Sequence, residues 1–176
     1  MTVESYQTKT KTTANGNYQI RLADADDLPR VENMWTALYQ HQQQNGMLIQ
    51  LPVNAFDLWV SSIKPLLGRF AWLFIIERNG ELAGFLAGRV RSLPPYFGGA
   101  QVGFISEVYV SDDHRQQGLG ERLVTTAMEF FSERGLTRVE LQVIMNNPAA
   151  RKLYQRLGWT EELVQMVWQP SAKNVE

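Results

Sequence analysis

VYVSDDHRQQGLG, residues 108–120, has the pattern of a strand that runs through a tight loop into a helix. Helix N-termini leave backbone N–H groups without partners and carry partial positive charge. The two glycines, Gly118 and Gly120, would let this backbone approach a phosphate without a Cβ in between. The segment therefore predicts a pyrophosphate-binding turn, with the Arg115 guanidinium as a further ligand of the anion.

The spacing of these two glycines, taken alone, also fits a plain strand-to-helix turn. Two nucleotide-binding motifs are excluded. The Gly-Lys-Ser/Thr of a P-loop is absent, and Leu123 stands where a dinucleotide-binding turn would need its third glycine.

Composition excludes several classes of function. The chain has 176 residues and a net charge of -1, so it lacks the basic surplus typical of a nucleic-acid-binding protein. The apolar run that contains Trp72–Ile76 is far shorter than the roughly 20 residues that a membrane-spanning helix needs. There are no cysteines, which excludes disulfides, thiolate metal sites and a cysteine nucleophile. We expect a metal-free protein of the reducing cytoplasm.

Apolar periodicity and turn residues predict an α/β domain with a mixed sheet and helices on its faces. Residues 1–16 are expected to be a disordered tail, residues 17–170 the domain, and residues 171–176 a C-terminal tail. The predicted strands are 18–22, 70–77, 81–90, 101–110, 138–145 and 163–168. The predicted helices are 27–42, 55–67, 118–134 and 148–157.

Two motifs together resemble a known family. Residues 115–120 (RQQGLG) are similar to the Arg/Gln-x-x-Gly-x-Gly/Ala motif of the GNAT superfamily of N-acyltransferases, and residues 147–159 (NPAARKLYQRLGW) are similar to its Asn-x-x-Ala-x-x-Leu-Tyr-x-x-x-Gly-Phe segment. Trp159 stands where Phe is commoner. The element order also agrees with that fold, so the resemblance covers about residues 17–169.

The resemblance implies how acetyl-CoA binds. The backbone of residues 108–110 would pair with the pantetheine arm, while Arg115, Gln116 and the N–H groups of residues 117–120 would hold the pyrophosphate. Asn147 would contact the pantetheine or position the last helix, and it also fits a simple helix N-cap. The implied acyl-CoA-binding residues are Val108, Tyr109, Val110, Arg115, Gln116, Gln117, Gly118, Leu119, Gly120, Asn147 and Tyr154.

Tyr154 is the candidate general acid, because its phenol would protonate the departing CoA thiolate. Its alternative is a core aromatic, since it shares a helix face with Ala150, Leu153 and Leu157.

Glu107 is the candidate general base that removes the proton of the attacking amine, and burial would raise its pKa toward a useful range. Its alternatives are an exposed carboxylate or an ion pair with Arg89 or Arg91. Ser106 and Tyr109 are weaker candidates for a proton relay.

The implied activity is transfer of an acetyl group from acetyl-CoA to a primary amine of a small molecule or a protein, by direct attack in a ternary complex. A non-catalytic acyl-CoA-binding module and a nucleotide-binding structural protein are the alternatives, and a homodimer is left open. The acceptor pocket is expected from residues 27–67, 91–100 and 160–166. Candidate acidic groups for a cationic acceptor are Glu32, Asp57, Glu161 and Glu162.

Overall fold

A single mixed sheet forms the centre of the computed structural model, which describes residues 18–169. The strands lie in the order β1-β2-β3-β4-β5; the first four are antiparallel neighbours, and β5 runs parallel to β4. Parallel neighbours need a crossover, which is the helix between β4 and β5. The strands are β1 Gln19–Leu22, β2 Ala71–Arg78, β3 Glu81–Ser92, β4 Gln101–Val110 and β5 Val139–Leu141.

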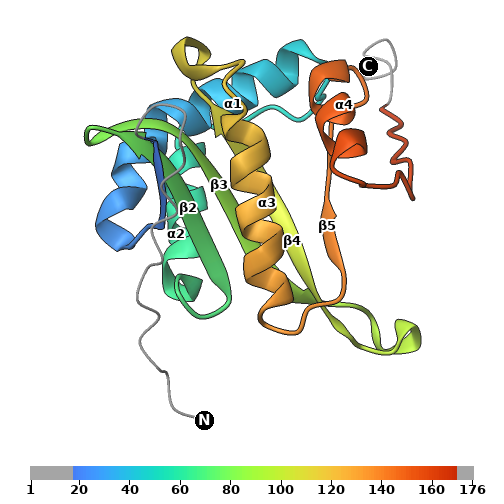
Figure 1. Cartoon of the computed structure of the whole chain (residues 1–176). Helices are drawn as coiled ribbons and strands as arrows, with labels where there is room; N and C mark the ends of the chain where they lie inside the picture. Colours follow the sequence, from blue (N-terminus) through green and yellow to red (C-terminus); the bar gives the residue numbers. More distant parts are fainter. Residues whose placement is uncertain (1–17, 170–176) are drawn as a thin grey trace.

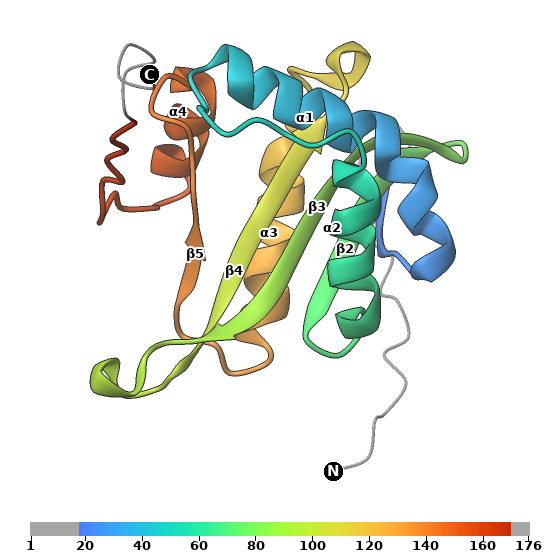
Figure 2. The same ribbon diagram turned by 180° about the vertical axis from the view of Figure 1, so that it is seen from behind.

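Helices cover both faces of this sheet. In Figure 1 α3 lies across the near face, and Figure 2 shows α1 and α2 across the opposite face. The α-helices are α1 Glu32–Gln44, α2 Ala55–Ile63, α3 Leu119–Ser132 and α4 Pro148–Arg156, and the short 3₁₀ helices are Ala25–Val31, Lys64–Leu66, Pro95–Phe97 and Asp112–His114.

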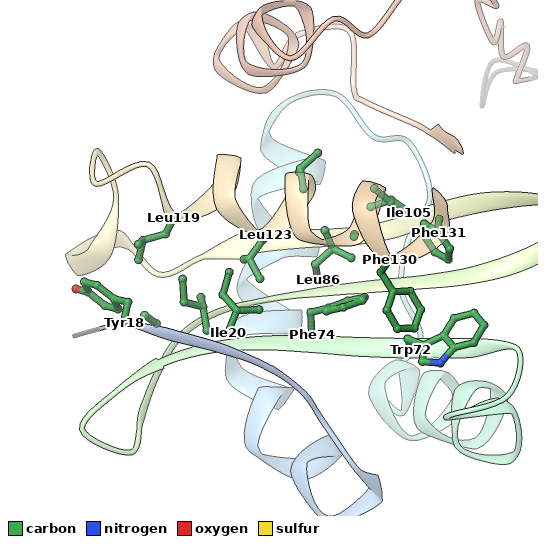
Figure 3. Close-up of a cluster of buried hydrophobic side chains, with 14 residues drawn as sticks. Tyr18, Ile20, Trp72, Phe74, Leu86, Ile105, Leu119, Leu123, Phe130 and Phe131 are labelled. Carbon is green, nitrogen blue, oxygen red and sulfur yellow. The ribbon is translucent and has the colours of Figure 1, made fainter. Parts of the chain in front are cut away.

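The core on the α3 side is rich in aromatic rings (Figure 3). Phe130 packs edge-to-face on Trp72, with ring centroids 5.0 Å apart. Phe131 lies so close to β4 that a Cβ on Gly103 would stand 2.9 Å from its ring. Glycine in this strand therefore lets α3 pack closely on the sheet. That packing fixes the helix whose N-terminus carries the glycine turn.

A second core lies between the sheet and the helices of the N-terminal half. It buries Trp35 and Leu38 of α1 against Leu73 and Phe85 of the sheet. Beside it, Asp27 is only 5% exposed and accepts hydrogen bonds from Arg21 at 2.6 and 2.8 Å and from Arg30 at 2.6 Å. These partners hold the pKa of Asp27 down at about 2 against the opposing effect of burial, with the Arg21 hydrogen bond as the largest cause. The pair ties β1 to the segment that leads into α1.

Most predicted elements are confirmed, and the mixed α/β sheet is as expected. The strand predicted over residues 101–110 is β4, and the helix predicted over residues 27–42 is a 3₁₀ turn followed by α1, with Asp24 as the N-cap. The predicted tails, residues 1–16 and 171–176, lie outside the described residues.

Two strand predictions are wrong. The strand predicted over residues 138–145 is paired only at Val139–Leu141, and residues 163–168 form no strand. An apolar segment makes a strand only where a neighbouring backbone accepts its hydrogen bonds, and residues 163–168 have no such neighbour within the described chain. Their apolar side chains stay exposed, Leu163 at 89% and Trp168 at 84%.

Candidate active site

A hollow opens where β4 and β5 separate. The two strands pair at Gly103–Val139, Phe104–Glu140 and Ile105–Leu141, and pairing then stops. Beyond Ile105 the side of β4 that faces β5 therefore has no partner strand, and residues 142–145 run apart from it. The walls of the hollow are Leu38, Gln42, Ile105, Ser106, Val108, Leu141, Gln142, Val143, Ile144, Asn147, Ala150 and Tyr154. Figure 2 shows β4 and β5 diverging toward α4.

A β-bulge at Ser106 decides which way the next side chains point. Ala87 of β3 is opposite Glu107, whereas Gly88 is opposite Ile105, so Ser106 is the extra residue. An extra residue reverses the alternation of faces along the strand. Ile105 and Val108 accordingly pack toward α3, and Tyr109 packs with the core on the α1 and α2 side.

Glu107 lies on the α1 and α2 side and is only 5% exposed. The Tyr39 hydroxyl of α1 donates a hydrogen bond to Glu107 Oε1 at 3.0 Å. Glu107 Oε2 is buried and accepts no hydrogen bond from the described residues. The predicted alternative of an exposed carboxylate is therefore wrong, and so is the Arg91 pairing, because Arg91 forms an ion pair with Glu140 instead.

Burial raises the pKa of Glu107 above its ordinary value, because the apolar surroundings disfavour the charged form. Ser106, Tyr39 and Trp59 lower the pKa in part, as does the positive charge of Arg89. The Ser106 hydroxyl itself donates to the Ala87 carbonyl at 3.3 Å, so it does not satisfy Oε2. The carboxylate thus keeps one free acceptor oxygen and an elevated affinity for a proton.

A second hollow adjoins the first at Ser106, which lines both. It lies between α2 with the following 3₁₀ turn and the strands β3 and β4, and Glu107 and Arg89 are its charged residues. Its full lining is Trp59, Ser62, Ile63, Leu66, Ala71, Gly88, Arg89, Ser106 and Glu107. Two compartments therefore meet beside one buried carboxylate.

Tyr154 of α4 lines the first hollow and also packs against the core on the α3 side. The core packing agrees with the alternative of a core aromatic, while the general-acid role stays a prediction. Its ring centroid is 5.9 Å from that of Trp159. Burial raises the pKa of Tyr154 to about 12, so its phenol is protonated at neutral pH.

The glycine turn before α3 has the strained backbone that an anion site can use. Gly118 is the helix N-cap with φ 72°, and Gln116 adopts φ 61°, which is uncommon for a residue with a Cβ. The first N–H groups of any helix have no intrahelical acceptor, and within residues 18–169 no side chain caps those of α3. Leu119 is buried, so only its backbone is available there, whereas Gln116, Gln117 and Gly118 are exposed.

Arg115 lies at this turn but is already engaged. Its guanidinium pairs with Asp112 at 2.8 Å, and Nε donates to the Val110 carbonyl at 3.2 Å. A phosphate would have to compete with Asp112 for it. His114 of the same turn is half-buried and shares a hydrogen bond of 2.7 Å with the hydroxyl of buried Tyr18.

Asn147 is the N-cap of α4, where its side-chain oxygen accepts from the Ala150 N–H at 3.1 Å. It also lines the first hollow, so the capping interpretation and a binding role are compatible. Of the three segments expected to form an acceptor pocket, residues 27–67 alone line the two hollows. Glu161 and Glu162 are held in ion pairs with Arg151 and Arg138.

Two residues of the site were not singled out from the sequence as site residues. Tyr39 lies in the predicted helix 27–42, and Trp59 lies in the predicted helix 55–67. Both carry a polar atom that needs a partner when buried, and that requirement is the signal that would have marked them.

Within residues 18–169 no group of three or more His, Asp or Glu side chains is placed to hold a metal ion, and no helix is long and apolar enough to cross a membrane.

Several solved structures with this arrangement of sheet and helices carry the name of an acetyltransferase. A protein of Clostridium acetobutylicum described as a predicted acetyltransferase, with acetyl-CoA, superposes with a TM-score of 0.72 at 15% identity, covering 86% of this chain and 96% of that one. The aminoglycoside N-acetyltransferase AAC(6')-Iy in complex with CoA gives 0.68 at 17% identity, covering 92% and 99%. These likenesses define the class of fold.

The family follows from the sequence comparison. The model of the acetyltransferase (GNAT) family matches residues 32–159, and the chain belongs to that family. It is 32% identical over 114 residues to an uncharacterized N-acetyltransferase of Methanocaldococcus jannaschii, covering 60% of this chain and 50% of that one. It is 35% identical over 98 residues to a mycothiol acetyltransferase of Amycolatopsis mediterranei, covering 52% and 33%. The chain thus spans half or less of the length of these two relatives.

Proposed function

We propose that the protein transfers an acetyl group from acetyl-CoA to a primary amine. The observation that carries this proposal is the position of Glu107. A buried carboxylate with a free oxygen stands where two hollows meet, one lined by the phenol of Tyr154 and the other by the walls beneath α2. A donor and an acceptor that enter from opposite sides would meet at this carboxylate.

Acetyl-CoA fits the first hollow and the adjoining turn. The unpaired side of β4 beyond Ile105 offers backbone groups to the amides of the pantetheine arm, as an added strand would. The side chains of Val108 and Val110 pack in the core, which leaves their backbone for this role. The N-terminus of α3, with Gly118 at positive φ, is suited to the pyrophosphate. Gln116, Gln117 and Arg115 flank the same turn.

Glu107 would act as the general base. Its raised pKa favours acceptance of a proton, and the Tyr39 hydrogen bond holds the carboxylate in place through Oε1 while Oε2 stays free. An ammonium entering the second hollow would give one proton to Oε2 and so gain the lone pair that attacks the thioester.

Tyr154 would act as the general acid. A phenol with a pKa near 12 keeps its proton at neutral pH and can pass it to the departing thiolate. In the overall reaction the C–N bond forms and the C–S bond breaks. The phenol gives its proton to sulfur, and the second proton of the amine then restores the phenol. Because the chain has no cysteine, no thioester on the protein intervenes, and we expect a ternary complex.

Calorimetric titration with acetyl-CoA, CoA and ATP, followed by thiol release with a panel of amines, tests the proposal. A chain without cysteine gives no background with a thiol reagent. We expect micromolar binding of acetyl-CoA, no binding of ATP, and thiol release that depends on an amine. Binding without release for any amine would instead indicate an acyl-CoA-binding module, and parallel initial-rate lines would contradict a ternary complex.

A homodimer and a cytoplasmic location stay predictions. Light scattering of the purified protein, and fractionation of the source cells, would decide them.

A further inference from the structure

Two charged groups at the second hollow lack an ion-pair partner among the described residues. Glu107 Oε2 accepts no hydrogen bond. Arg89 of β3 lines the same hollow, and its guanidinium lies 5.7 Å from the centroid of the Phe104 ring without pairing with any described carboxylate. Two residues further along β3, Arg91 does pair with Glu140. Arg89 acts on Glu107 only at long range, by lowering its pKa.

The remaining walls of this hollow are apolar or small. Trp59, Ile63 and Leu66 form the side made by α2 and the turn after it, and Ala71 and Gly88 belong to the strands beneath. Trp59 stacks on Phe56 with ring centroids 5.6 Å apart, which fixes the indole. The hollow thus offers an apolar wall between a free carboxylate oxygen and a free guanidinium.

Resting on the proposed function, we propose that the acceptor is a small amine that also carries a carboxylate, an amino acid with an apolar side chain. Its ammonium group binds Glu107 Oε2, its carboxylate binds the Arg89 guanidinium, and its side chain lies against Trp59. Both unpaired charges are then satisfied by one zwitterion.

The same charges act against other amines. A simple cationic amine, or a polycation such as an aminoglycoside, gains the Glu107 contact but meets the positive charge of Arg89 with nothing to neutralise it. A carboxylate on the acceptor removes that repulsion and adds a charge-assisted hydrogen bond. Specificity for the zwitterion therefore arises from one attraction and one repulsion at Arg89.

The test compares amino acids with their decarboxylated amines: L-leucine with isoamylamine, L-phenylalanine with phenethylamine, and L-tryptophan with tryptamine. Thiol release gives kcat/KM for each, and calorimetry in the presence of CoA gives binding without turnover. We expect at least one amino acid to exceed its decarboxylated partner about tenfold or more in kcat/KM. We also expect Arg89→Met to remove that preference by lowering kcat/KM for the amino acid and raising it for the decarboxylated amine.

Arg78→Met is the matched control, because Arg78 also lies over an aromatic ring, 5.1 Å from the centroid of Tyr18, but does not line the hollow. Arg78→Met should leave kcat/KM unchanged for both the amino acid and its decarboxylated amine. Preference for the decarboxylated amines, or an equal fall for both members of each pair in Arg89→Met, would overturn the inference while leaving the proposed function intact. Absence of thiol release with every amine would overturn both.

Discussion

Glu107→Gln separates the effect of Glu107 on catalysis from its effect on stability, because the buried carboxylate influences both. Glutamine has the same shape, and its carbonyl can still accept the Tyr39 hydrogen bond of 3.0 Å, but it cannot take a proton from an amine. Loss of a general base lowers kcat by about 10²–10⁴, which corresponds to about 3–5 kcal/mol in the activation free energy. The assay is thiol release from acetyl-CoA with a fixed amine across pH 5–10.

The pH profile carries the sharper expectation. In the native protein kcat/KM should rise with pH as Glu107 loses its proton, at a pKa raised above the ordinary carboxyl value by burial. In Glu107→Gln that rise should vanish and activity should follow deprotonation of the free amine, which lies at more alkaline pH. An unaltered pH–rate profile would refute the reasoning and assign the proton to bulk water.

The same substitution, which lowers activity, should raise the stability of the folded protein. A carboxyl whose pKa is higher in the folded state binds more protons there, so its favourable contribution is present below its unfolded pKa and is lost as pH rises through the folded pKa. At pH 8 Glu107→Gln should therefore have a higher Tm than the native protein. The gain should disappear at pH 4. Exposed Glu81→Gln is the control and should show neither change.

Three further predictions concern other parts of the molecule. Tyr154→Phe should lower kcat about 10–100-fold while acetyl-CoA affinity by calorimetry is retained, and unchanged turnover would remove the phenol from the acid role. Gly118→Ala should weaken acetyl-CoA binding about tenfold and lower the free energy of unfolding by about 1 kcal/mol. Gly135→Ala is the control: Gly135 has φ 76° and lies beyond the other end of α3, so this substitution should lower stability alone. Asp27→Asn should lose about 1–2 kcal/mol in urea unfolding at pH 6; because the folded pKa of Asp27 is depressed to about 2, the loss should shrink between pH 4 and 2, and a pH-independent loss would contradict the Arg21 pairing.

Local patterns predicted most of the elements because each depends on near neighbours in the chain. The helix over residues 148–157 needs only its N-cap, Asn147, and an apolar stripe, and α4 follows that pattern. The strand predicted over residues 163–168 failed because an apolar segment does not specify a partner strand. Pairing is decided by the distance to another backbone, which for these residues no local signal contains.

The candidate site divides in the same way. The glycine turn and Glu107 were singled out from residue type and spacing, and Tyr154 from the resemblance of residues 147–159 to the family's motif. Tyr39 and Trp59 were not, because their part depends on α1 and α2 lying over β4. Tyr39 and Glu107 are 68 residues apart in the chain, and they form a hydrogen bond only because α1 packs over the sheet.

The sequence by itself therefore indicated most of the element types, the glycine turn at Gly118 and the residues able to carry acid–base chemistry. The tertiary structure alone decided what those residues face. A regular strand over residues 101–110 would place Ile105 and Glu107 on one face, inside the core beneath α3. The bulge at Ser106 inserts one residue opposite β3 and turns Glu107 to the other face, where Tyr39 meets it. The physical reason is that side-chain direction in a strand has a period of two, so a single unpaired residue, set by the register of β3 against β4, reverses the placement of every side chain after it.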